Sequence, residues 1–157
     1  MKIKCIQEWL IMILLTAIHV QSNETIKVKN ASEAVKESVA YLNEHYAQKA
    51  PALDIQWRER TIFSGGPVDL VTTAKQFTSD GWSIEVTEEF APVKNIVYQV
   101  MIFSPKLGLY WKGRVKADGS VKEESLLRQL PEEEKQRVME EFLRRSKIPP
   151  PQGGYGH

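Results

Sequence analysis

The clearest pattern of hydrophobic and polar positions lies between residues 95 and 124. Residues 96–103 (IVYQVMIF) are almost all β-branched, aromatic or long and apolar, which is typical of a central strand. Residues 109–116 alternate instead, which predicts a strand with one buried face and one solvent face. The Asp118-Gly119 pair then marks a tight turn into a short third strand, because glycine accepts a positive φ. The stretch therefore predicts a twisted antiparallel sheet.

Helical spacing comes before this sheet. Between residues 32 and 49 the apolar side chains recur every three or four positions, and Pro51 marks the stop. Period-two patterns follow at 53–63 and around 82–86, whereas 68–78 fits either a strand or an irregular crossover. We expect the helix to lie across the sheet, with its aromatic side chains in the core.

A second helical pattern covers residues 131–147. Its first turn is acidic and its last turn is basic, which suits the helix dipole. Its apolar stripe consists of Val138, Met139, Phe142 and Leu143. This stripe either covers the sheet or docks on a partner. Residues 148–157, rich in Pro and Gly, are expected to form a disordered tail.

Together these elements predict one α+β domain at residues 23–130, followed by the helix at 131–147. We expect one N-terminal helix packed on a curled antiparallel sheet of four to five strands, in a cystatin-like arrangement, plus a C-terminal helix.

Residues 1–22 have the order of a secretory signal peptide. Two lysines precede the uncharged segment 10–20, and a polar stretch follows it. Such a segment is too short to cross a bilayer of about 30 Å as a helix. We therefore expect cleavage after Ser22 and a secreted or extracytoplasmic protein of the cell envelope. The alternatives are a buried N-terminal core helix and an uncleaved signal anchor, and only the anchor would bring membrane contact.

The amino-acid composition limits which bonds, nucleophiles and partners the protein can have. The single cysteine, Cys5, lies inside the predicted leader, so the mature chain would have no disulfide and no thiol nucleophile. Acidic and basic side chains nearly balance, which gives no reason to expect a nucleic-acid partner. Asn23 and Asn30 begin glycosylation sequons, although Asn30 or Ser32 is better explained as a helix cap.

No motif for catalysis emerges. Outside the leader and the last residue, His45 is the only histidine, so we assign no metal site. Gly65-Gly66 lacks the remainder of a phosphate loop, and no cofactor is expected. Glu85, Glu88 and Glu89 gather near one strand end. They suit either acid–base work or a solvated strand face, and we favour the solvated face. We therefore assign no catalytic residue.

The strand motifs resemble a known family. A helix and antiparallel strands, with Tyr98-x-Val100-x-Ile102 followed by Gly113-x-Val115-x-x-Asp118-Gly119-x-Val121, are similar to the PepSY domains of exported microbial proteins. The wider cystatin-like architecture is a looser match. The resemblance covers residues 32–124 and implies an extracytoplasmic, non-catalytic module, with peptidase inhibition or peptide binding proposed for relatives. The Gln-x-Val-x-Gly hairpin of cystatin inhibitors is absent at 99–103, so inhibition of cysteine peptidases is not carried over.

We therefore expect a small exported binding domain that takes a peptide or protein through the face or edge of its sheet. The predicted ligand surface is Tyr98, Tyr110, Lys112 and Arg114. One alternative is a small-ligand carrier or enzyme with a pocket between helix and sheet. Another is a structural subunit in which Val138, Met139, Phe142 and Leu143 bind a partner or form a homodimer, so both a monomer and a homodimer stay open.

Overall fold

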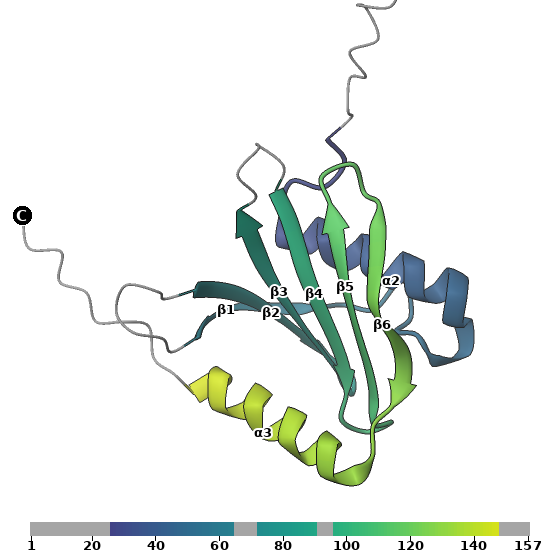
Figure 1. Cartoon of the computed structure of the whole chain (residues 1–157), viewed down its shortest axis with the longest axis vertical. Helices are drawn as coiled ribbons and strands as arrows, with labels where there is room; N and C mark the ends of the chain where they lie inside the picture. The colour runs from purple at the N-terminus through teal and green to yellow at the C-terminus, as the bar shows by residue number, and fades with distance from the viewer. Residues whose placement is uncertain (1–25, 65–71, 91–95, 148–157) are drawn as a thin grey trace, which may run out of the picture.

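The computed structural model describes residues 26–64, 72–90 and 96–147. In these ranges six antiparallel strands form one sheet whose spatial order, β1-β2-β3-β4-β5-β6, equals the chain order. Helix α2 lies behind strands β5 and β6 in Figure 1, and helix α3 runs along the lower left of the view, below the strands. The elements are α2 Ala31–Tyr46, the 3-10 turn η1 Ala47–Lys49, β1 Arg58–Ser64, β2 Thr72–Ser79, β3 Trp82–Phe90, β4 Ile96–Ser104, β5 Leu109–Lys116, β6 Val121–Gln129 and α3 Glu132–Lys147.

The predicted α+β class is confirmed, with an antiparallel sheet, a helix on the N-terminal side and a C-terminal helix. The predicted count of four to five strands is wrong, because the sheet has six. Residues 72–79 form strand β2, which pairs on both sides, rather than a crossover. The short third strand also extends further than expected and ends at Gln129, where it pairs with Leu109.

Helix α2 begins with a reciprocal cap. The side-chain oxygen of Asn30 accepts a hydrogen bond from the backbone N–H of Glu33 at 2.9 Å. The Glu33 carboxylate accepts in turn from the backbone N–H of Lys29 at 2.6 Å. The Asn30 bond satisfies a donor that the first helical turn leaves unpaired, and the Glu33 bond satisfies the N–H just before the cap. Of the two predicted caps, Asn30 is the N-cap, and Ser32 lies inside the helix.

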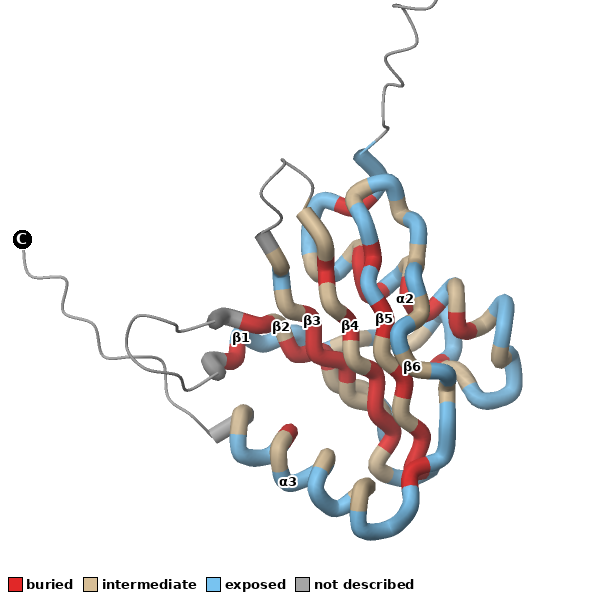
Figure 2. Tube along the Cα trace, in the orientation of Figure 1, coloured by how far each residue is buried: buried red, intermediate tan, exposed pale blue. Residues whose placement is uncertain are grey.

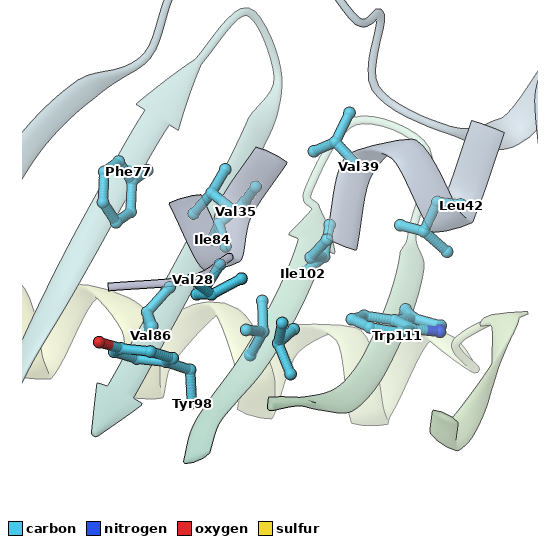
Figure 3. Close-up of a cluster of buried hydrophobic side chains, with 13 residues drawn as sticks. Val28, Val35, Val39, Leu42, Phe77, Ile84, Val86, Tyr98, Ile102 and Trp111 are labelled. Atoms are coloured by element: carbon cyan, nitrogen blue, oxygen red, sulfur yellow. The ribbon is translucent and has the colours of Figure 1, made fainter. Parts of the chain in front are cut away.

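The main core lies between α2 and the sheet (Figure 3). Val35, Val39 and Leu42 of α2 face Ile84, Val100, Ile102 and Trp111 of the sheet, and all of these are buried. The carboxylate of Glu123 accepts from the Trp111 indole N–H at 2.7 Å and from the Tyr46 hydroxyl at 2.9 Å. The space under the middle of α2 is therefore filled by packed side chains.

Gly113 allows the Trp111 ring to lie flat on strand β5. A Cβ at position 113 would stand 2.4 Å from the indole ring and 3.1 Å from the carbonyl oxygen of Lys122. No Cβ fits at the first of these distances, so the buried tryptophan depends on glycine at this position.

Burial differs between the two helices. Figure 2 shows buried positions along the middle strands, while α3 is mostly exposed.

The predicted leader at 1–22 and the tail at 148–157 lie outside the described residues. Within the described ranges, no helix is both long and apolar enough to cross a membrane.

Candidate functional site on the α3 side of the sheet

Helix α3 lies across the sheet face opposite α2 and is held there by a small apolar contact. Phe142 stacks on Phe103 of β4 with ring centroids 5.7 Å apart, and Leu130 is buried beside them. Val138 and Tyr110 pack against this cluster and are partly buried.

The predicted partner stripe on α3 is therefore divided. Val138 and Phe142 contact the sheet of the same chain, and Phe142 is only 9% exposed. Met139 and Leu143 are exposed. A surface made of all four residues is ruled out, because two of them already pack inside the molecule.

The predicted ligand surface is brought together only in part. Tyr110, Lys112 and Arg114 lie on one face of β5, the face toward α3, and burial decreases along them toward the exposed Arg114. Tyr98 is a wrong assignment. Its register partner is Val115, so its side chain points to the α2 side, where it is 2% exposed.

A row of polar side chains crosses strands β1, β2 and β3 on the α3 side. Gln76 stands opposite Arg60 on one neighbouring strand and Glu85 on the other. The Arg60 Nε–H donates to the side-chain oxygen of Gln76 at 2.5 Å. Gln76 and Glu85 are each 2% exposed. The expectation of a solvated strand face is therefore wrong for Glu85, because α3 covers this part of the sheet.

Glu85 is paired with the last turn of α3. The Arg145 guanidinium donates to the Glu85 carboxylate and also to the Glu141 carboxylate, at 2.7 Å from Nε. Arg144 binds Glu141 as well, at 2.7 Å. Burial raises the pKa of Glu85 even though Arg145 acts to lower it. The hydrogen bonds from Arg144 and Arg145 lower the pKa of Glu141 to about 2. These linked ion pairs join α3 to the sheet.

A groove of about 210 Å³ lies between α3 and the sheet beside these ion pairs. Its walls are mostly apolar, with charged groups among them. The sheet contributes Glu85, Met101 and Tyr110, and α3 contributes Arg137, Val138, Glu141, Phe142 and Arg145. Such a mixed lining suits an apolar group that carries polar atoms at its end.

Further along the same face, strands β3 to β6 carry a polar strip, defined as Glu89, Gln99, Lys112, Arg114 and Glu124. Glu124 pairs with Lys112 at 3.3 Å and with Arg114 at 2.7 Å. Glu89 accepts from the Gln99 amide at 3.3 Å and lies 3.6 Å from Arg114. The two cations and two anions balance, so the strip offers hydrogen-bond donors and acceptors without a net charge.

Within the described residues, no metal site and no histidine lies at the groove. Nowhere in the described ranges do three His, Cys, Asp or Glu side chains gather as metal ligands would. His45 lies on α2, where its ring stacks on Tyr41 at 4.1 Å and its Nδ1 lies 2.9 Å from the Tyr41 carbonyl oxygen. It does not approach the groove residues.

Sequence reasoning missed Gln76 and Arg145. The available signal was the spacing on α3, where Val138, Phe142 and Arg145 follow one another at intervals of four and three residues and so share a helix face. A cation on the face that covers a sheet calls for a carboxylate opposite it.

Comparisons of the chain with protein-family models, curated proteins and solved structures give no match. The candidate site is therefore defined by its own geometry.

Proposed function

We propose that this protein is a non-catalytic binding module that takes an extended peptide on the α3 side of its sheet. The observation that carries the proposal is the groove beside α3 with the polar strip next to it on the same face. An apolar side chain of the peptide enters the groove, and the strip pairs with the peptide's polar groups.

Size and charge support a peptide ligand. The groove has the volume of about seven water molecules at roughly 30 Å³ each, which is comparable with one large apolar side chain. The balanced charges of the strip favour a ligand with neutral amides over a polyanion or polycation. Edge strand β6 borders this face, and Leu126 on it is 68% exposed.

A non-catalytic role is supported by the state of the buried carboxylate. Glu85 is already bound by Arg145, so the side chain with the raised pKa is engaged in holding α3. We further propose that the domain is a cystatin-like module related to PepSY domains, since in this domain, as in the family pattern, one helix lies over an antiparallel sheet. Helix α3 departs from that pattern. The order of residues 1–22 supports a secreted or extracytoplasmic location.

The proposal is tested by selecting peptides from a random phage-displayed library on the full chain and mapping a selected peptide by amide NMR shifts. We expect shifts at Met101, Tyr110 and Lys112. Val138→Asp puts a carboxylate into the apolar groove and should weaken binding about tenfold. Arg114→Glu should weaken it about fivefold.

The matched control is Lys36→Glu, an exposed charge reversal on α2. It should leave the affinity unchanged. The proposal fails if no peptide is enriched, if the shifts lie on α2, or if the control weakens binding as much as Arg114→Glu does.

A further inference from the structure

A second cavity, separate from the groove, lies on the α2 side of the sheet beside the first turn of α2. Its volume is about 290 Å³. Ala31 of α2 and Ala74 and Val86 of the sheet form apolar walls. This cavity lies at the N-terminal end of α2, where the helix no longer fills the space above strands β1 to β4.

Tyr98 is one of the residues that line this cavity. Figure 3 shows the Tyr98 ring beside Val86 with its oxygen pointing away from Trp111, and both Tyr98 and Val86 line the cavity. The residue is 2% exposed, yet its hydroxyl makes no hydrogen bond to any group in the described ranges. Since its oxygen is not sealed from the open volume, a ligand in the cavity can reach it. A ligand in the cavity can therefore exchange hydrogen bonds with a hydroxyl that no group of the described residues occupies.

The lining of the cavity includes one ammonium group, Lys75, and one carboxylate, Glu88. Lys75 is held by Glu59 at 2.9 Å and by the Thr61 hydroxyl at 3.0 Å. Glu88, directly opposite Tyr98 on the neighbouring strand, is exposed and forms no ion pair within the described part of the chain. Burial raises the pKa of the Tyr98 hydroxyl, and the negative charges of Glu88 and Glu33 raise it further.

We propose that this cavity binds a small organic ammonium compound with an apolar body. The ammonium group would pair with Glu88 and donate to the Tyr98 oxygen, while the apolar body would lie against Ala31 and Val86. The volume equals about ten water molecules at roughly 30 Å³ each, which suits an arylalkylamine of about ten non-hydrogen atoms.

The test uses phenethylamine as the probe, added to the full chain up to about 10 mM and followed by amide NMR shifts. We expect saturable shifts at Val86, Glu88 and Tyr98, with a Kd of about 1 mM. Phenylacetate has the same ring with the opposite charge and should give no saturable shifts there. The proposal is overturned if phenylacetate binds as well as phenethylamine, or if neither compound moves these amides.

Three substitutions separate specific recognition from mere apolar contact. Tyr98→Phe removes only the oxygen and should weaken phenethylamine about tenfold. Glu88→Gln should weaken it about threefold. Glu132→Gln, at an exposed acid on α3 that lines neither cavity, is the matched control and should leave phenethylamine binding unchanged. Unchanged binding in both Tyr98→Phe and Glu88→Gln overturns the proposal, and if Tyr98→Phe does not fold, Glu88→Gln alone decides. Peptide binding beside α3 does not enter this test, so the two proposals fail independently.

Discussion

Replacing Arg145 by glutamine tests the ion pair that joins α3 to the sheet. The substitution removes the cation but leaves Glu85, which is 2% exposed, buried without its partner. Breaking a fully buried pair costs about 3–5 kcal/mol. The Arg145 side chain is 26% exposed and Glu85 can take up a proton, so we expect roughly half of that, about 2 kcal/mol.

Urea unfolding followed by tryptophan fluorescence measures this loss, because Trp111 is fully buried. With a slope of about 2 kcal/mol/M, the midpoint should fall by about 1 M. If α3 detaches before the sheet unfolds, the same energy appears as hydrogen exchange of the α3 amides that is about 30-fold faster.

Two variants make this result interpretable. Arg144→Gln removes a guanidinium that binds the same Glu141, but its side chain is 59% exposed, so the midpoint should not change measurably. Glu85→Gln removes the buried charge itself and should be milder than Arg145→Gln. Equal effects of Arg145→Gln and Arg144→Gln, in unfolding and in exchange, would refute the reasoning.

Two further predictions concern packing and pH. Gly113→Ala drives a methyl group into the Trp111 ring and should destabilise the fold by about 2 kcal/mol, so an unchanged Tm would contradict the close contact. The pKa of Glu85 is raised in the folded state, so its contribution to stability is complete below the unfolded pKa and is lost as pH rises through the folded value. The pKa of Glu141 is lowered to about 2, so its contribution to stability is present above its ordinary pKa of 4.5 and is lost as pH falls toward 2. Urea midpoints of the wild type and of Glu85→Gln, measured from about pH 7 to 3, test both statements. The variant should lose the pH dependence of the midpoint above pH 4.5 and should keep the decrease of the midpoint below pH 4.5. Parallel curves for the variant and the wild type above pH 4.5 would contradict this.

Local patterns in the sequence predicted the parts of the fold that depend on neighbouring residues. The alternation in β5 placed Tyr110, Lys112 and Arg114 on one face, and the two candidate caps, Asn30 and Ser32, marked the start of α2. Both depend on backbone geometry within a few residues.

The face that Tyr98 occupies was not predictable in this way. Strand β4 is apolar on both sides, so its pattern does not say which side faces α2. The cross-strand register with Val115 decides it. Glu85 shows the same limit. The alternation along β3 correctly put Glu85 and Ile84 on different faces of the sheet, but it could not show that α3 covers the face of Glu85.

The strand order of the sheet also determines when each part of the chain finds its contacts. Every strand pairs with its neighbour in sequence, so each hairpin can form as soon as its second strand leaves the ribosome. Arg145 lies 60 residues after Glu85. During synthesis, that carboxylate must therefore remain hydrated while the sheet assembles around it, and the docking of α3 is the step that finally removes it from water.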